Sequence, residues 1–189
     1  MFERLKRIPP VQHSTAGPFH LIYLRADGGY RDQKTIAALK RKLYLELLNR
    51  HRIICFDSVT VYRQHADGWN GETWACMWVR DNALGTAGAN DYLSRSLGAD
   101  TIPLENTFER DWARVHAERS LNTVVIPEQP VFEVAVRYRG EPTASRWASR
   151  VLPHLEHAVR EHGRRVEPIL EVTDSLYKSV RYLMERVPN

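Results

Sequence analysis

The segment from residue 32 to residue 52 constrains the fold most, because its pattern is compatible with only one local structure. Its apolar side chains recur every three or four residues, which places them on one stripe of a helix. They are Ile36, Leu39, Leu43, Tyr44, Leu47 and Leu48. Cations fall elsewhere on the helical wheel or in the last turn, where they interact favourably with the helix dipole. The segment is therefore predicted to be one long helix with an apolar face and a basic face.

The composition is that of a folded protein. The 189 residues are 43% hydrophobic and include five Trp, eight Tyr and five Phe, more aromatic surface than a disordered chain carries. No apolar run approaches the roughly 18 residues needed to cross a bilayer, so no transmembrane segment is predicted. Cys55 and Cys76 lie in apolar segments without metal-binding or redox spacing. They are predicted to be buried free thiols in a reducing compartment, with a single disulfide as the alternative.

Strand-like and helical segments alternate along the front of the chain. The predicted order is strand 19–26, helix 32–52, strand 53–64, strand 72–80, a helix around Trp112 and strand 122–126. A turn-forming segment at 67–71 predicts that the second and third strands form a hairpin. In the third strand Trp74, Cys76 and Trp78 alternate with other apolar residues, so both of its faces are expected to be covered, or one of them to be reserved for a partner. This β-α-β-β-α-β order is that of a ferredoxin-like sandwich.

A proline-containing stretch at 126–130 indicates a boundary before the tail. An alternating strand beginning near Phe132, a helix that ends at Gly163, a strand at 166–172 and a last helix after Asp174 or Ser175 are predicted. This β-α-β-α unit is expected to form a second layer beside the first, with one continuous sheet as the alternative. The predicted class is α+β. The predicted domains are an N-terminal arm or targeting segment with a polar linker (1–18), the ferredoxin-like sandwich (19–127) and the β-α-β-α unit (128–189).

Patterns for catalysis or metal binding are scarce. The sequence has no HExxH, GxSxG, Walker or zinc-ribbon spacing, so no catalytic residue, metal or cofactor is predicted. His154 and His157 are three residues apart on a predicted helix, but they are read as surface histidines because no further ligand stands near them in the sequence. Acids around the predicted hairpin could instead hold a metal in a phosphodiesterase or nuclease, which is the alternative function. They are Asp57, Asp67, Glu72 and Asp81.

Charge is distributed unevenly along the chain. Residues 1–55 contain eleven Lys or Arg against four Asp or Glu, a balance of +7, whereas residues 56–129 contain six against eleven, a balance of −5. This asymmetry indicates a surface that meets an anionic partner, although a solvated basic face fits it equally well. Arginine near Trp and Tyr suits both RNA and protein interfaces. The predicted contact residues are Lys34, Lys40, Arg41, Lys42, Arg50, Arg52, Arg137, Arg139, Arg146, Arg150, Arg164 and Arg165.

The layout of the tail resembles a known domain. A strand from Phe132, a helix led by Ser145-Arg146 and a strand containing Pro168-Ile169-Leu170-Glu171 resemble the thioredoxin-like domain of some mitochondrial ribosomal proteins and of a small accessory subunit of respiratory complex I. The preceding elements are similar to small ribosomal proteins with a ferredoxin-like fold. The cysteine-containing start of the first family is missing, so no functional residue is carried over.

This resemblance implies a non-catalytic structural subunit of a large assembly. The assembly is expected to be a ribonucleoprotein, such as a mitochondrial ribosome. The protein would contact RNA or neighbouring subunits through its basic faces. A mitochondrial location follows from that expectation. A viral or phage assembly protein is a further alternative, for which the location would be cytoplasmic or the virion.

Overall fold

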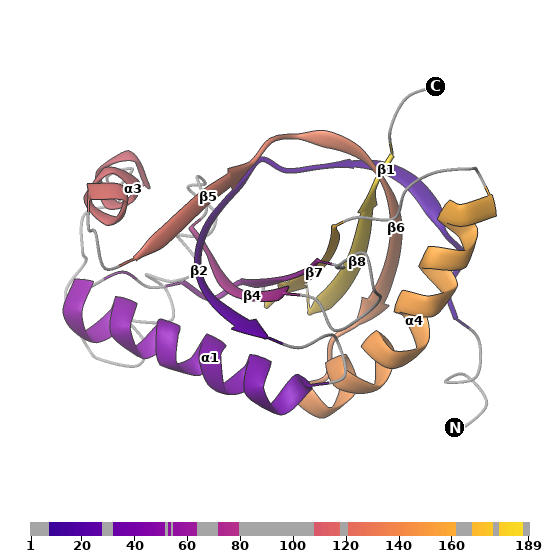
Figure 1. Ribbon diagram of the computed structural model, residues 1–189, viewed down its shortest axis with the longest axis horizontal. Coiled ribbons are helices and arrows are strands. Elements are labelled where there is room, and N and C mark those ends of the chain that lie inside the picture. The colour runs from indigo at the N-terminus through magenta and orange to yellow at the C-terminus, as the bar shows by residue number, and fades with distance from the viewer. Residues whose placement is uncertain are drawn as a thin grey trace.

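The computed structural model describes residues 8–27, 32–51, 53, 55–63, 72–79, 108–117, 121–161, 168–175 and 178–186. In this part of the chain an eight-stranded antiparallel sheet curls around an apolar interior, with helices on its outside (Figure 1). The α+β class is therefore confirmed. No helix among the described residues is long and apolar enough to cross a membrane.

Strands make up slightly more of the regular secondary structure than helices do in the described part of the chain. The strands are β1 (Gln12–Ala16), β2 (Phe19–Asp27), β3 (Ser58–Tyr62), β4 (Glu72–Val79), β5 (Asn122–Ile126), β6 (Gln129–Arg137), β7 (Ile169–Asp174) and β8 (Ser179–Glu185). The helices are α1 (Gln33–Glu46), its π-helical continuation η2 (Leu47–His51), α3 (Phe108–Ala117) and α4 (Glu141–Glu161). The strand order is β1-β6-β8-β7-β3-β4-β2-β5.

The register shows that the sheet closes on itself. β1 and β2 follow one another directly and pair with β6 and β5 in one unbroken register, as Ala16↔Gln129 and Phe19↔Ile126 show. They form one long two-stranded ribbon. Because β2 also pairs with β4, and β6 also pairs with β8, this ribbon joins the two ends of the strand order. The sheet therefore surrounds its own interior (Figure 1).

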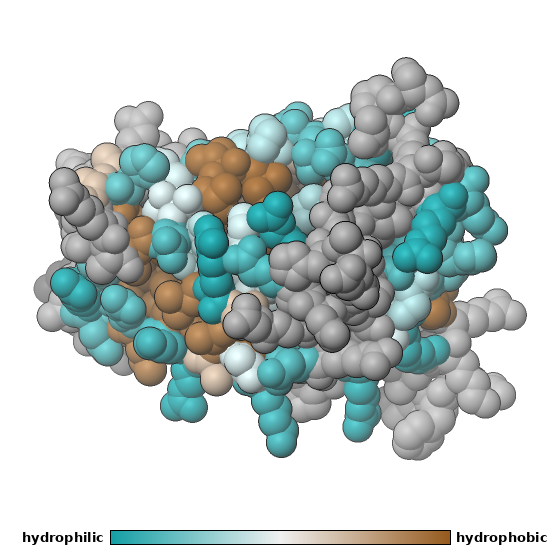
Figure 2. Space-filling model, in the orientation of Figure 1, coloured by the Kyte–Doolittle hydropathy of each residue, from teal (hydrophilic) through white to brown (hydrophobic). Residues whose placement is uncertain are grey.

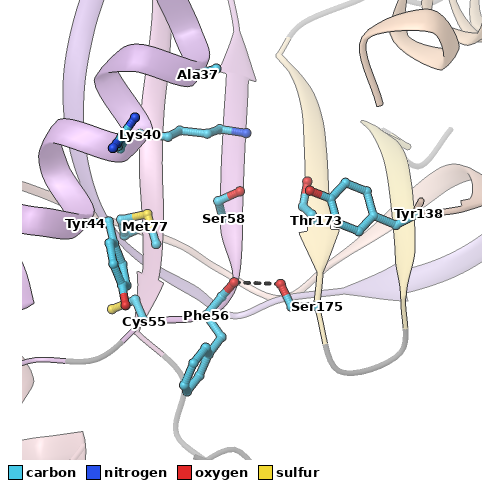
Figure 3. A pocket seen from close by; sticks show the side chains of 11 residues that line it. Ala37, Lys40, Tyr44, Cys55, Phe56, Ser58, Met77, Tyr138, Thr173 and Ser175 are labelled. Atoms are coloured by element: carbon cyan, nitrogen blue, oxygen red, sulfur yellow. Dashed lines mark hydrogen bonds between the residues drawn. The ribbon is translucent and has the colours of Figure 1, made fainter. Parts of the chain in front are cut away.

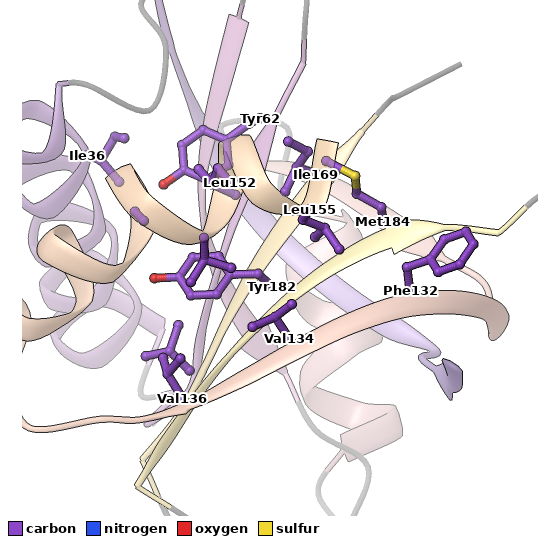
Figure 4. Packing of buried hydrophobic residues seen from close by; sticks show 13 residues of the cluster. Ile36, Tyr62, Phe132, Val134, Val136, Leu152, Leu155, Ile169, Tyr182 and Met184 are labelled. Atoms are coloured by element: carbon purple, nitrogen blue, oxygen red, sulfur yellow. The ribbon is translucent and has the colours of Figure 1, made fainter. Parts of the chain in front are cut away.

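Alternate residues of each strand fill the inside of the sheet or pack under the helices. The inner cluster contains Phe19, Leu21 and Val59, with Trp74 and Trp78 packed against it. The prediction that Trp74, Cys76 and Trp78 share one face is confirmed. On the outside, one cluster lies under α4 and another under α1. The cluster under α4 is drawn in Figure 4. Apolar residues are also exposed at the surface beside α1 and over the ribbon (Figure 2).

The ribbon bends sharply at Gly17, where only glycine fits. Its φ is +105°, a backbone conformation that residues with a side chain rarely adopt. A Cβ atom at this position would lie 2.8 Å from the backbone oxygen of Pro127 in the opposite strand. The close approach of the two strands at the bend therefore depends on the missing side chain.

The chain contains two copies of the same β-α-β-β unit. The first is β2-α1-β3-β4 and the second is β6-α4-β7-β8, with strand orders β2-β4-β3 and β6-β8-β7. The two units meet where β3 pairs with β7 in antiparallel fashion, with Thr60↔Glu171 at the centre of that pairing. α1 and α4 therefore lie on the outside on either side of this join (Figure 1).

Three expectations about the tail and the N-terminus are wrong. The last described element is strand β8 and not a helix, because it pairs with both β6 and β7, and its three successive buried residues Tyr182, Leu183 and Met184 interrupt the two-residue period. Residues 12–16, expected to be linker, form strand β1, because their backbone pairs with β6, although Ala16 is the one buried side chain among them. The expected second layer is part of the same sheet, because β3 pairs with β7 across the predicted boundary.

Candidate functional site

A cleft opens between α1 and the strands at the β3–β7 join. Its volume is about 410 Å³ (Figure 3). Most of the lining area is apolar or aromatic, supplied by Ala37, Tyr44, Cys55, Phe56, Met77 and Tyr138. The polar lining residues are Lys40, Arg41, Ser58, Thr173 and Ser175. The cleft thus combines apolar walls with a few polar groups.

The sequence of α1 determines which side chains face the cleft. The carboxylate of Asp32 caps the helix by accepting a hydrogen bond of 3.2 Å from the backbone N–H of Thr35. Buried Ile36 and Leu43 anchor the helix to the sheet. The neighbouring stripe, spaced by three and four residues, carries the cleft residues Ala37, Lys40, Arg41 and Tyr44. The apolar pattern that predicts the helix therefore also positions one wall of the cleft.

Hydrogen bonds fix the opposite wall at the ends of β3 and β7. The Ser175 hydroxyl donates to the Phe56 backbone oxygen at 2.8 Å, and the Ser175 backbone N–H donates to Asp57 Oδ1 at 2.8 Å (Figure 3). Ser58 and Thr173 are directly paired across the two strands. Because opposite residues in an antiparallel pair point to the same face, both lie on the cleft side of the sheet. Phe56, 43% exposed, stands at the opening of the cleft.

A buried carboxylate lies behind Lys40. Glu171 is 2% exposed and accepts a hydrogen bond of 3.0 Å at Oε2 from the Tyr62 hydroxyl. The Tyr62 oxygen in turn accepts one of 3.1 Å from Gln33 Nε2. Lys40 Nζ lies 3.9 Å from Glu171 Oε1. Burial of a carboxylate costs several kcal/mol unless it is paired and hydrogen-bonded, so this network supplies what Glu171 requires.

The two tyrosines beside Glu171 stay protonated at neutral pH. Burial raises the pKa of Tyr62 well above its ordinary value, and the nearby charge of Glu171 raises it further. Burial also raises the pKa of Tyr182, with added contributions from Glu171 and Tyr62. In Figure 4 the two hydroxyl groups point to the same side of the cluster. Both phenols are therefore neutral side chains that can donate a hydrogen bond.

The ammonium group of Lys40 is only loosely held. Its distance of 3.9 Å from Glu171 is too long for a hydrogen bond. Within the described part of the chain it has no hydrogen-bond acceptor, although its side chain is only 12% exposed. Lys40 therefore balances the charge of Glu171 while keeping its N–H groups available to the cleft.

The predicted contact residues are distributed over several elements. Lys40 and Arg41 line the cleft, whereas Lys34, Lys42 and Arg50 are exposed on α1 and η2, with Arg50 3.9 Å from Glu46. The tail cations Arg137, Arg139, Arg146 and Arg150 are exposed, and the guanidinium of Arg150 lies 5.3 Å from the ring centre of Trp147. Arg52, Arg164 and Arg165 lie outside the described residues.

Of the four acids proposed for a metal site, the two that the structure describes, Asp57 and Glu72, lie at opposite ends of the β3–β4 hairpin. The backbone oxygen of Asp57 accepts from Trp78, whereas that of Glu72 accepts from Arg63 at the other end of the hairpin. Six residues of strand separate these ends, roughly 20 Å, and Glu72 is paired with Arg25 at 3.1 Å. Asp67 and Asp81 lie outside the described residues. No group of three or more potential ligands is present in the described ranges.

The structure confirms the predictions for the histidines of α4 and for the two cysteines. His154 and His157 are exposed on α4, and His157 Nε2 lies 3.2 Å from Glu161, so their reading as surface histidines is confirmed. Cys55 and Cys76 are confirmed as buried free thiols. Burial raises the pKa of the Cys76 thiol, which keeps it protonated.

Sequence reasoning missed Glu171, Tyr62 and Gln33. A signal was present for Glu171, which stands in the middle of the apolar run Ile169–Val172. A charged residue inside a strand with both faces covered must have buried partners, which makes it a candidate site residue. Its partners could not be named in advance, because Tyr62 is 109 residues away in the sequence.

Comparison with known proteins gives only distant likenesses. No protein-family model matches the sequence, and no curated protein matches it. The solved structure of SAV2435 bound to tetraphenylphosphonium has 10% identity and a TM-score of 0.49, with 93% of each chain covered. A putative transcription regulation protein from Staphylococcus aureus MU50 has 12% identity and a TM-score of 0.47, with 94% of this chain and 97% of that chain covered.

An integron cassette protein from the mobile metagenome of Vibrio cholerae is similar at the same level. It has 11% identity and a TM-score of 0.43, with 93% of this chain and 94% of that chain covered. At TM-scores below 0.5, these likenesses carry no argument about what this chain binds.

Proposed function

We propose that this protein binds a small organic molecule in the cleft beside α1. The observation that carries the proposal is the combination of apolar and aromatic walls with a buried polar network in a cleft of about 410 Å³. Small-molecule sites typically have roughly 300–1,000 Å³, apolar walls and a few well-placed polar groups. Tyr44, Phe56, Met77 and Tyr138 would cover the body of the ligand, and Lys40 would meet its polar group.

The supporting elements suit a preformed site. Two hydrogen bonds from Ser175 hold the ends of β3 and β7 together, and Ile36 and Leu43 anchor α1 to the sheet. A site held in its binding geometry loses less conformational entropy when the ligand binds. The cleft is therefore expected to accept a ligand without rearrangement of its walls.

Filling the cleft should abolish ligand binding. Ala37 lines the cleft and Ala38 is exposed beside it on the same helix, so Ala37→Trp is the test and Ala38→Trp the matched control. A fragment library screened by thermal shift should contain ligands that raise the Tm of the wild type and of Ala38→Trp but not of Ala37→Trp. A ligand at 100 times its Kd stabilises by about 2.7 kcal/mol. A library without any stabilising ligand, or equal stabilisation of both variants, would contradict the proposal.

A second candidate is contact of α1 with RNA. Lys34, Arg41 and Lys42 are exposed on this helix and have no acidic partner among the described residues. Such cations suit phosphate contacts, which make binding depend steeply on salt. The role of a structural subunit in a ribonucleoprotein, a mitochondrial location and the ferredoxin-like description of residues 19–127 belong to this candidate and stay predictions.

Charge reversal outside the cleft tests this candidate. Lys34→Glu combined with Lys42→Glu should weaken binding of a single-stranded RNA oligonucleotide by about tenfold or more and lower its salt dependence, by about 0.7 in slope per lost phosphate contact. Fluorescence anisotropy at several salt concentrations measures both quantities. Lys178→Glu combined with Arg186→Glu, exposed just outside the two ends of β8, reverses the same number of charges and is the control for net charge. A wild type that binds no RNA at low salt would exclude the candidate.

A further inference from the structure

We infer that the cleft selects carboxylates, with the Lys40 ammonium binding the carboxylate of the ligand and Glu171 acting as an internal counter-ion. This inference rests on the proposed function and names the class of ligand. The ligand would be a small carboxylic acid in its ionised form, with an aromatic or aliphatic body.

The charges that line the cleft favour an anion. The described lining residues include two cations, Lys40 and Arg41, and no Asp or Glu. Two buried carboxylates lie behind the lining: Glu171 next to Lys40, and Asp57, whose Oδ1 accepts from the Ser175 backbone N–H. The charged groups of the described lining itself are both cations, so a ligand that enters the cleft meets positive charge first.

Lys40 has the free hydrogen-bonding capacity that a carboxylate needs. An ammonium group has three N–H donors, and none of them has a hydrogen-bond acceptor among the described residues. Glu171 Oε1 is 3.9 Å away and Oε2 already accepts from Tyr62. Because Lys40 is 12% exposed, water can satisfy its donors only in part. A ligand carboxylate at about 2.8 Å would supply charge-assisted bonds of the strongest kind.

A cationic ligand faces an obstacle at the same place. Two carboxylates lie next to the described lining. Asp57 is 6% exposed and its carboxylate accepts from the Ser175 backbone N–H, whereas Glu171 lies behind Lys40 with a side chain 3% exposed. A cation could reach the carboxylate of Glu171 only by displacing the ammonium of Lys40. The displaced ammonium would then have to find another position in a largely apolar cleft, which costs free energy.

The remaining walls match the body of such an acid. Tyr44 and Phe56 stand on one side of the cleft and Tyr138 on the other, with Met77 on the sheet (Figure 3). Aromatic and thioether side chains pack well against planar apolar groups. Ser58 and Thr173 add hydroxyl groups to the cleft side of the β3–β7 pair, where one of them can donate to the second carboxylate oxygen.

Three ligands with one carbon skeleton test the inference. Naphthalene-2-carboxylate, its neutral amide and naphthalene-2-methylammonium are titrated by calorimetry at constant ionic strength. The wild type should bind the carboxylate about tenfold or more tightly than the ammonium compound, with the amide between them, because a hydrogen bond to a charged group contributes about 1.5–3 kcal/mol.

Substitution of Lys40 should reverse this order. Lys40→Met keeps the length of the side chain and removes its charge, so carboxylate affinity should fall about tenfold while ammonium affinity rises, because Glu171 is left uncompensated. Lys42→Met, exposed on the same helix, should leave all three affinities unchanged. If Lys40→Met does not fold, the double variant Lys40→Met with Glu171→Gln removes both charges and should prefer the amide.

Two results would overturn the inference and leave the proposed function standing. They are equal affinity of the wild type for the three ligands, and an unchanged carboxylate affinity in Lys40→Met. A fragment screen without any ligand that depends on Ala37 would instead remove the proposed function, and the inference with it.

Discussion

At the scale of single residues, the buried network at Glu171 connects stability with function. Tyr62 donates to Glu171 and accepts from Gln33, so one hydroxyl joins the sheet to the first turn of α1. Lys40 completes the network from the same helix. The two hydrogen bonds of Tyr62 favour one arrangement of the groups that they join. The position of α1, and with it the shape of the cleft, therefore depends on Tyr62.

Removal of the Tyr62 hydroxyl should destabilise the fold. Tyr62→Phe leaves Glu171 Oε2 without this donor, which should lower the free energy of unfolding by about 1–3 kcal/mol in urea denaturation at pH 7. The matched control is Tyr44→Phe, whose side chain is only partly buried at the cleft wall. A Tyr62→Phe variant as stable as the wild type would show that the network contributes nothing to stability.

The raised pKa of Tyr62 gives this variant a second signature. In the unfolded chain a tyrosine ionises near pH 10, but folded Tyr62 remains protonated well above that pH. The stability that protonated Tyr62 contributes is therefore fully present below about pH 10. It is lost as the pH rises further, because unfolding then releases the proton. Tyr62→Phe should show a smaller alkaline loss, and Tyr182 accounts for part of the remainder.

At the scale of elements, the bend of the ribbon is the least replaceable feature. Gly17→Ala combines a positive φ with a Cβ 2.8 Å from the Pro127 backbone oxygen. We expect a loss of about 1–3 kcal/mol of stability, measured by urea denaturation. Pro127→Ala leaves that oxygen in place and should not rescue the variant. A wild-type unfolding midpoint for Gly17→Ala would show that the strands can separate at the bend without cost.

Elements whose local pattern fits a single structure could be predicted, and those whose pattern fits two structures or none could not. The stripe of α1 and the two runs of the β3–β4 hairpin were assigned correctly because local period and turn residues agree. β8 was mistaken for a helix because Leu176, Val180, Leu183 and Val187 fit helical spacing in the sequence. The pairing of residues 179–185 with β6 and β7 shows that they form a strand. The polar sequence of β1 carries no strand signal, since its backbone makes the pairing.

At the scale of the whole molecule, the arrangement follows from pairings between residues far apart in sequence. The closure of the sheet depends on the register of β1 and β2 with β6 and β5, whose paired residues are about 100 to 120 positions apart in the sequence. The join of the two β-α-β-β units depends on β3 and β7, equally distant. Neither pairing can be recognised from the local composition of the strands or from their hydrophobic periodicity. The cleft could not be predicted for the same reason, because its two walls come from different units.

The join of the two units also bears on how such a site can arise. Thr60 and Glu171 occupy corresponding central positions and face each other across the strands. In a symmetric dimer of identical units, both positions would carry the same side chain, and two glutamates placed there would repel one another. A single chain removes that restriction, because each half can vary alone. The first half could then keep a small hydroxyl and supply the lysine from α1, while the second half acquired the acid. The resulting binding site has different groups at its two ends, which a symmetric pair could not provide.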